Sequence, residues 1–178
     1  MQTRWIAVAA AAALGVALHG GAMRAAAGPY SKIGEIQIGG PAGFDYLNVD
    51  PVAKRLYVTN GASIVAFDVQ GPGKLGNQRE FVKLHDGGNG DGLAVDTDGR
   101  LYVAAGPGVQ VYARDGKYLG VIPTPTSGRP TGQAFAGADR RTLYVVVQAT
   151  TDFNGQTIAG RNVYRIPVLA RGLADRSK

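Results

Sequence analysis

Apolar and polar residues alternate in short runs along most of the chain, and clusters of Gly, Asp, Asn and Pro separate the runs. Val109-Gln110-Val111-Tyr112 shows this alternation, and β-branched and aromatic residues are frequent in the runs. A period of two is typical of strands that bury one face, and no segment after residue 27 keeps the 3.6-residue period of an amphipathic helix. The pattern predicts an all-β protein.

Three segments repeat the same order of strand, turn and strand. Each contains Leu-Tyr-Val, at residues 56–58, 101–103 and 143–145, so the repeats are 45 and 42 residues apart. A period of about 40 to 50 residues with several short strands in each unit is typical of β-propellers. We therefore expect three blades in this chain, each a four-stranded antiparallel sheet. The expected blades cover about residues 43–84, 91–122 and 131–168.

Turn-forming clusters separate the first expected strand of each unit from the second. They are Asp50-Pro51, Asp96–Gly99 and Gly137–Asp139. Asp side chains can accept hydrogen bonds from backbone amides in such turns, and Gly can take a positive φ, so each cluster predicts a hairpin. Two further stretches, residues 70–78 and 150–161, are rich in Gly, Pro or polar residues and are expected to be loops.

The third unit lacks a fourth strand before the polar tail at residues 170–178, whereas a spare strand, Ile33–Ile38, precedes the first unit. Three blades are too few for a ring, since propellers usually have ~4 to 8. Two alternatives stay open. Two chains could form a homodimer with six blades, each donating residues 33–38 to the other, or the chain could be an open arc or a truncated relative of a longer propeller.

The N-terminal segment has the features of a secretory signal peptide. Met1–Trp5 carries one positive charge, the apolar run Ile6–Leu18 follows, and Ala25-Ala26-Ala27 is a small-residue cleavage site. This run is shorter than the ~20 residues that cross a bilayer as a helix, which argues against the alternative of a permanent anchor. We expect cleavage after Ala27 and release of residues 28–178 into the periplasm or the medium, with no membrane attachment afterwards.

Charge and nucleophile patterns exclude two classes of function. Cleavage after residue 27 would leave 17 basic and 13 acidic residues, and the basic residues are dispersed along the chain. Such a distribution argues against a nucleic-acid partner. After residue 27 the only histidine is His85, and no serine has a Gly-x-Ser-x-Gly setting, so a Ser-His-Asp hydrolase is not supported.

Residues 91–168 contain several motifs in a fixed order. Asp-Gly-Leu-Ala-Val-Asp-x-Asp-Gly-Arg-Leu-Tyr-Val-Ala begins at Asp91, Gly-Val-Gln-Val-Tyr-x-x-Asp-Gly-Lys at Gly108, and Ala-Phe-Ala-Gly-Ala-Asp-Arg-Arg-Thr-Leu-Tyr-Val at Ala134. This segment resembles the C-terminal portion of the gluconolactonase, regucalcin and luciferin-regenerating enzyme superfamily. Residues 43–69, with Arg55-Leu-Tyr-Val-Thr-Asn60, resemble instead the YVTN-type repeats of bacterial propellers.

The resemblance to the lactonase superfamily implies a divalent cation at the top of a six-bladed propeller. In that family a glutamate, an asparagine and an aspartate from different blades hold the ion, often Ca²⁺ or Zn²⁺. The resemblance assigns the aspartate to Asp91, as a metal ligand and as the general base. The motifs that carry the glutamate and the asparagine have no match in this sequence, so the implied metal site is incomplete.

The repeat offers one substitute ligand. Asp45 in the first unit has the same place as Asp91 in the second, at the start of the innermost strand, where a side chain faces the channel mouth. Two carboxylates from adjacent blades could bind a cation or polarise a water. The alternative is that each aspartate caps the amides of its own loop.

The sequence leaves three classes of function. The first is an exported propeller with a binding or scaffolding role, which holds a small-molecule ligand or a protein at the channel mouth. The alternative is a metal-dependent lactonase-type hydrolase that acts on sugar lactones, with Asp91 as its ligand or base. The third is a relative without activity of its own. Fold resemblance does not carry function without the site, and the missing ligands favour the binding role.

Overall fold

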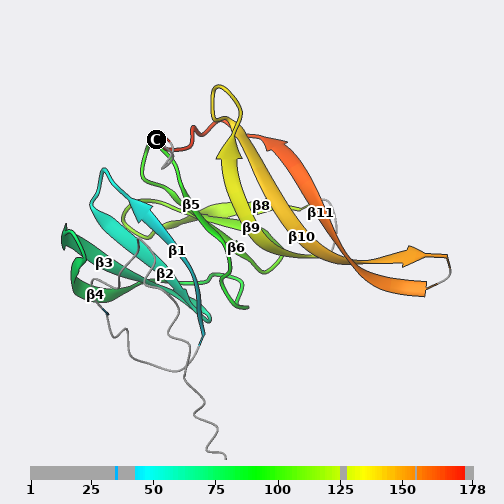
Figure 1. Ribbon diagram of the computed structural model, residues 1–178, viewed down its shortest axis with the longest axis horizontal. Coiled ribbons are helices and arrows are strands. Elements are labelled where there is room, and N and C mark those ends of the chain that lie inside the picture. The colour runs from blue at the N-terminus through cyan, green and yellow to red at the C-terminus, as the bar shows by residue number, and fades with distance from the viewer. Residues whose placement is uncertain (1–34, 36–42, 125–127, 155, 175–178) are drawn as a thin grey trace, which may run out of the picture. The chain divides into compact units, whose positions relative to one another are not determined.

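The structure, a computed structural model, describes residues 35, 43–124, 128–154 and 156–174, and for residues 44, 45, 150–153 and 157–159 it describes the backbone alone. The predicted signal peptide and, except for Glu35, the spare strand at residues 33–38 lie outside this part. The described residues form eleven strands and no helix, which confirms the all-β prediction (Figure 1). They therefore include no helix long and apolar enough to cross a bilayer.

The strands form three antiparallel sheets, in which each strand pairs with the next along the chain. The first sheet contains β1 (Phe44–Asp50), β2 (Arg55–Asn60), β3 (Ser63–Gly71) and β4 (Lys74–Lys83). The second contains β5 (Leu93–Val95), β6 (Leu101–Ala105), β7 (Gly108–Tyr112) and β8 (Tyr118–Pro123). The third contains β9 (Arg129–Ala136), β10 (Thr142–Phe153) and β11 (Gln156–Pro167). The prediction of three antiparallel sheets is confirmed; two of them have the predicted four strands, and the third has three described strands.

The turns between the first two strands share one backbone feature in all three sheets. The fourth residue after the first strand takes a positive φ, of 49° at Lys54, 77° at Gly99 and 56° at Arg140. In the first two turns a buried aspartate accepts two backbone amides: Asp50 from Val52 and Ala53, and Asp96 from Asp98 and Arg100, all at 2.9 Å. The turn clusters therefore form hairpins, as the sequence predicts.

The expected loop at residues 70–78 is wrong, because β3 and β4 continue through it and are joined by a short turn at Pro72-Gly73, with φ 66° at Gly73. The register between β3 and β4 is irregular, and Asn77 has a φ of 52°. The Asp68 carboxylate accepts hydrogen bonds from Asn77 at 2.8 Å and Arg79 at 2.9 Å, which supports the irregular pairing. Polar composition here marks an edge strand.

The expected loop at residues 150–161 is also wrong. The register of β10 and β11 is unbroken from Thr142 opposite Pro167 to Phe153 opposite Gln156, and β9 pairs only with the first part of β10. The paired ends of β10 and β11 therefore extend beyond β9 (Figure 1). Asn154, with a φ of 50°, begins an Asn-Gly sequence, which favours a tight hairpin turn.

Two apolar clusters hold the sheets together. In the first, Tyr57 and Ile64 of the first sheet pack with Leu101 and Val103 of the second. In the second, Tyr102 packs with residues of the third sheet, and its ring meets that of Phe135 edge-on at 5.0 Å. The repeated tyrosines at 57 and 102 thus pack between neighbouring blades.

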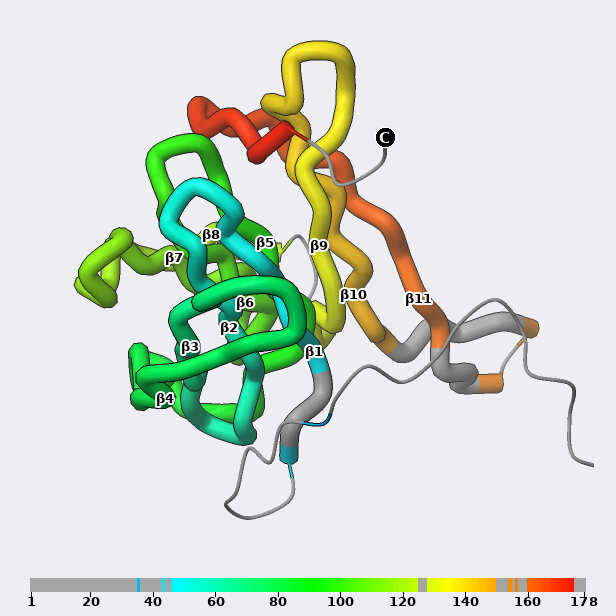
Figure 2. Tube along the Cα trace, turned by 60° about the vertical axis from the view of Figure 1, so that its left-hand side comes forward, coloured from blue at the N-terminus to red at the C-terminus, as the bar shows by residue number. Residues whose placement is uncertain are grey.

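The innermost strands β1, β5 and β9 lie next to one another (Figure 2). The Asn48 side chain of β1 donates to the Leu93 carbonyl of β5 at 3.0 Å. The Gly92 amide donates to the carbonyl of Thr131 in β9 at 3.2 Å. The Gln133 amide of β9 donates to the carbonyls of Gly92 at 2.9 Å and Tyr102 at 2.8 Å. These bonds fix the strands around a shared space.

Candidate functional site

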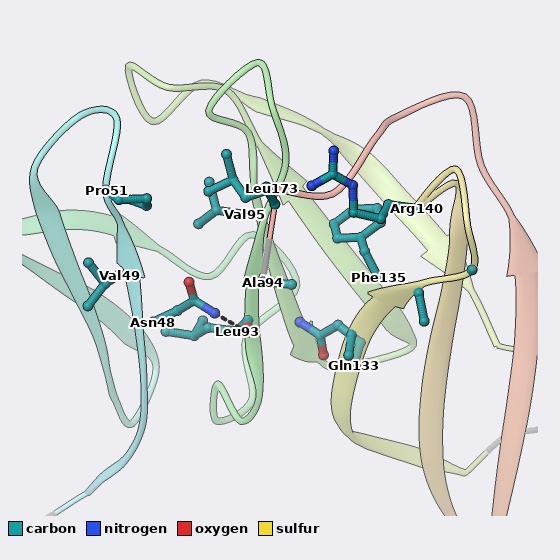
Figure 3. Close-up of a pocket in the computed structure, with 14 residues that line it drawn as sticks. Asn48, Val49, Pro51, Leu93, Ala94, Val95, Gln133, Phe135, Arg140 and Leu173 are labelled. Atoms are coloured by element: carbon teal, nitrogen blue, oxygen red, sulfur yellow. Dashed lines mark hydrogen bonds between the residues drawn. The ribbon is translucent and has the colours of Figure 1, made fainter. Parts of the chain in front are cut away.

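A cavity of about 610 Å³ lies between the innermost strands of the three sheets (Figure 3). Its walls come from the last part of β1, from β5, from the second half of β9 with the following turn, and from the C-terminal segment. Most of the lining is apolar, and the main apolar contributors are Val49, Pro51, Leu93, Val95, Phe135 and Leu173. The cavity exists because the first strand of each sheet faces the same space.

Two amide side chains, Asn48 and Gln133, line the cavity, and both donate hydrogen bonds to backbone carbonyls of the second sheet. Asn48 donates to Leu93, and no described residue donates to its Oδ1. Gln133 donates two of the hydrogen bonds that connect β9 to the second sheet, and its Oε1 is buried without a described partner. A buried acceptor without a partner costs about 1–3 kcal/mol, so the position of Gln133 is set by its donor bonds.

Among the described residues that line the cavity, Arg140 is the one that carries a charge. Both the amide and the carbonyl of Arg140 form backbone hydrogen bonds. The amide donates to the Gly137 carbonyl at 3.0 Å, and the carbonyl accepts from the Gly172 amide at 2.9 Å. The Arg140 side chain has no ion pair with any described residue. Figure 3 shows Arg140 at one end of the cavity, beside Phe135 and near Leu173.

Asp91 lies just before β5 and is not part of the cavity lining. Its side chain is only 7% exposed, and its Oδ2 forms an ion pair with the Arg129 guanidinium at 2.9 Å. Its amide donates to the carbonyl of Ala104 at 2.9 Å, which extends the pairing of β5 and β6. The side chain of Asp45, the second predicted ligand, lies outside the described residues.

The described residues around Asp91 do not fit a divalent cation. Calcium usually takes ~6 to 8 oxygen ligands, and the described part of the chain has no group of three Asp, Glu, His or Cys residues placed to share an ion. The Asp91 carboxylate already has a cationic partner in Arg129. A metal at Asp91 would have to displace that guanidinium, so the ligand role of Asp91 stays a prediction.

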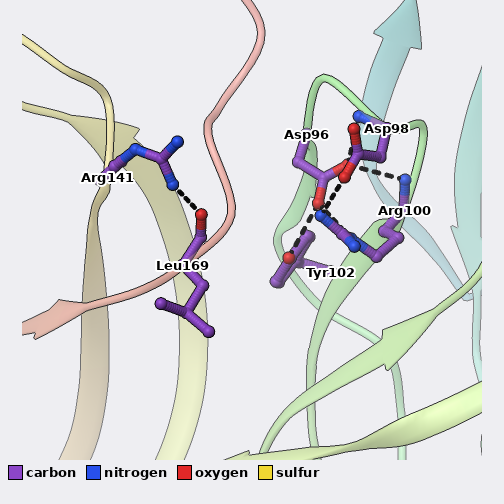
Figure 4. A network of polar contacts seen from close by, with 6 residues as sticks. All are labelled: Asp96, Asp98, Arg100, Tyr102, Arg141 and Leu169. Atoms are coloured by element: carbon purple, nitrogen blue, oxygen red, sulfur yellow. Dashed lines mark hydrogen bonds and ion pairs between the residues drawn. The ribbon is translucent and has the colours of Figure 1, made fainter.

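A second buried carboxylate, Asp96, has a structural role (Figure 4). Its side chain is fully buried, and its Oδ2 accepts from Arg100 Nε at 2.6 Å and from the Tyr102 hydroxyl at 2.9 Å. Burial, followed by the negative charge of Asp96, raises the pKa of Tyr102 well above its usual value. The hydrogen bond from Arg100 to Asp96 raises the pKa of that guanidinium. Because every described partner of the Asp96 side chain belongs to its own hairpin, the network stabilises the turn.

Comparison with known proteins now places the chain. A family model described as the SMP-30/gluconolactonase/LRE-like region matches residues 16–149. The chain belongs to this family. The match includes the first sheet, so all three sheets lie wholly or partly within the SMP-30/gluconolactonase/LRE-like region. The YVTN resemblance of residues 43–69 stays a prediction.

Individual members of the family support the assignment. Regucalcin from Gallus gallus is 35% identical over 88 residues, which are 47% of this chain and 29% of regucalcin. A gluconolactonase from Xanthomonas campestris is 34% identical with a TM-score of 0.51, over 57% of this chain and 34% of that one. A luciferin-regenerating enzyme has a TM-score of 0.62 over 75% of this chain and 48% of its own, at 23% identity, and thus shows the fold alone. The chain spans less than half the length of each.

Sequence reasoning missed both arginines of this region. Arg129 lies two residues before Thr131, the position that the repeat pairs with Asp91, so aligning the repeats does not point to it. Arg140 belongs to an Arg-Arg pair in a turn, which by itself indicates a solvated surface. The repeat gave no signal for Arg140, because aligning the Leu-Tyr-Val segments places Arg141, and not Arg140, opposite Gly99.

Proposed function

We propose that this chain is a ligand-binding member of the SMP-30/gluconolactonase/LRE-like family that binds a small molecule in the cavity between its innermost strands, without a metal at Asp91. The observation that supports this most is the cavity itself, which all three sheets line. Its volume is within the ~300–1,000 Å³ of small-molecule sites. A mostly apolar lining with a few polar groups is also typical of such sites.

The ion pair of Asp91 supports a function without a metal. A carboxylate that binds a cation or activates water needs its oxygens available to that ion or water. In this chain one oxygen of the buried Asp91 contacts Arg129. The pair neutralises the charge that would attract a divalent ion, and it connects the loop before β5 to the start of β9.

Binding of Nile red, a neutral apolar dye, tests cavity binding without assuming the charge of the natural ligand. Ala134 is exposed and lines the cavity, so Ala134→Trp should fill it without altering the buried core. Ala62 is also exposed but is not in the lining, and Ala62→Trp is the matched control. We expect saturable binding by the wild type and the control and loss of binding in Ala134→Trp. Equal binding by all three proteins would refute the proposal.

A metal-dependent lactonase is the second candidate. It is favoured by the 34% identity to the Xanthomonas campestris gluconolactonase and by the place of Asp91 in its motif. Hydrolysis of glucono-δ-lactone with added Ca²⁺ or Zn²⁺ distinguishes the two functions. Turnover above the uncatalysed rate that needs the metal and is lost in Asp91→Asn would establish the lactonase and remove the metal-free proposal.

Export and assembly remain proposals beside the binding role. The sequence of residues 1–27 supports export, and the third sheet has an edge at β11 that no described strand covers. N-terminal sequencing of the protein from a periplasmic extract would test cleavage after Ala27. Light scattering would test the homodimer, in which residues 33–38 of each chain add to the other, because a monomeric mass would contradict it.

A further inference from the structure

We propose that Arg140 is the anion anchor of the cavity and that the ligand is a small monocarboxylic acid with an apolar body. This inference rests on the proposed function, since it names the ligand class of the same cavity. Its first basis is charge: among the described lining residues Arg140 is the one cation, and no carboxylate accompanies it.

Arg140 is available to a ligand because its backbone, and not its side chain, holds the turn. The Arg140 amide and carbonyl bond to Gly137 and Gly172, and the adjacent Arg141 binds the Leu169 carbonyl with its own guanidinium. The carboxylate in the same turn, Asp139, accepts a hydrogen bond from the Arg141 amide. The turn is therefore held by the Arg140 backbone and by bonds of Arg141, and the Arg140 guanidinium is unpaired among the described groups.

The repeated turn explains the backbone of Arg140 but not its side chain. Lys54 and Gly99 take the same left-handed conformation in the other two sheets, so the positive φ belongs to the turn. Glycine adopts this conformation without the strain that other residues bear there. An arginine is therefore not needed for the turn, and of the two cations in this position only Arg140 lines the cavity.

The rest of the lining indicates what the anion is attached to. The apolar part of the lining is mainly Leu93, Val95, Phe135 and Leu173, which favour an aliphatic or aromatic group. The amides of Asn48 and Gln133 are committed to Leu93, Gly92 and Tyr102 and leave few donors for a sugar. A guanidinium at one end binds a carboxylate by charge-assisted hydrogen bonds, often two in parallel. The cavity thus matches an amphipathic acid.

Displacement of Nile red by octanoate and by octan-1-ol tests this assignment, because the two probes share a chain length and differ in charge. Arg140→Gly removes the guanidinium and supplies the residue found at Gly99, so the turn should fold and the melting temperature should change by no more than about 4 °C. Lys54→Gly is the matched control, with the same change in the same turn of the first sheet, outside the cavity.

We expect octanoate to bind the wild type and Lys54→Gly equally and to bind Arg140→Gly about tenfold or more weakly, with octan-1-ol unaffected by either substitution. Equal octanoate affinity in wild type and Arg140→Gly overturns the anchor. If Nile red still binds and Ala134→Trp still blocks it, that result leaves the proposed function standing. Failure of Nile red to bind the wild type removes both.

Discussion

Gly92 lies where the backbones of β5 and β9 come closest. A Cβ built on Gly92 would be 2.6 Å from the Cα of Gly132 and 3.2 Å from the carbonyl oxygen of Thr131. Both are backbone atoms and cannot rotate away, so a side chain here would force the two sheets apart. Gly132 faces the same contact, but a Cβ on it meets nothing within 4 Å.

We expect Gly92→Ala to lower the free energy of unfolding by about 2 kcal/mol or more, because overpacking displaces backbone. Gly132→Ala should change it by less than about 1 kcal/mol and is the matched control. Urea unfolding followed by fluorescence measures both. Equal stability of the two variants would show that β5 and β9 are further apart than described.

Tyr102 makes stability depend on pH in the alkaline range. Burial and the Asp96 charge raise the pKa of Tyr102 above the usual value of a tyrosine, and burial also raises the pKa values of Tyr57 and Tyr112. These tyrosines stay neutral in the folded state when they already ionise in the unfolded one. Their contribution is complete below about pH 10 and falls as the pH rises above it.

We expect Tyr102→Phe to be less stable than the wild type at pH 7 by about 1–2 kcal/mol, because Asp96 loses a hydrogen-bond donor. Above pH 10 the stability of the variant should fall less steeply, since one of the buried phenols is gone. Urea unfolding between pH 7 and 11 measures both effects. A variant with the wild-type slope would place the alkaline sensitivity in other groups.

At the scale of elements, the ion pair of Asp91 and Arg129 connects the loop before β5 to the start of β9. Removing only Arg129 leaves a buried carboxylate without its cation, which is costly, while removing both charges is less so. The cost of removing Arg129 is reduced because its side chain is 53% exposed, so water already screens part of the interaction. The loss of stability in either single variant is therefore larger than the coupling energy between Asp91 and Arg129, because each single variant leaves one charge unpaired.

We expect Arg129→Gln to cost about 1–3 kcal/mol and the double variant with Asp91→Asn to cost less than the sum of the two single changes, by about 1 kcal/mol. Unfolding of the wild type, both single variants and the double variant closes the cycle. Additive effects would mean that the two groups do not interact in solution, and the argument against a metal at Asp91 would lose its basis.

The same scale shows how far the sequence predicts strands. Leu-Tyr-Val, the alternation in β7 and the turn aspartates Asp50 and Asp96 act locally, so the hairpins they form were predicted. The expected loops at 70–78 and 150–161 were wrong because composition does not stop backbone pairing, which depends on the partner strand. Arg129 and Arg140 escaped prediction for a related reason: their roles come from contacts between sheets.

For the whole molecule, three sheets place β1, β5 and β9 around one cavity, and family membership was predicted from motifs that the comparison confirms. The position of the cavity along the innermost strands could not be predicted, because the sequence identifies carboxylates and does not reveal a cavity. Asp91 precedes β5, whereas the cavity lies along β5 and beyond it. The candidate binding site therefore lies near Arg140 and not at the strand starts, where the sequence placed it.

Methyl NMR of the full chain, titrated in turn with octan-1-ol and with Ca²⁺, tests the central claim most directly. The account predicts that octan-1-ol shifts the methyl signals of Leu93, Val95 and Leu173, which line the cavity, and leaves Leu75 and Leu119 unchanged. Calcium should shift none of them. A calcium-dependent shift centred on Leu93, two residues from Asp91, with no response to octan-1-ol would contradict the account and restore the metal site.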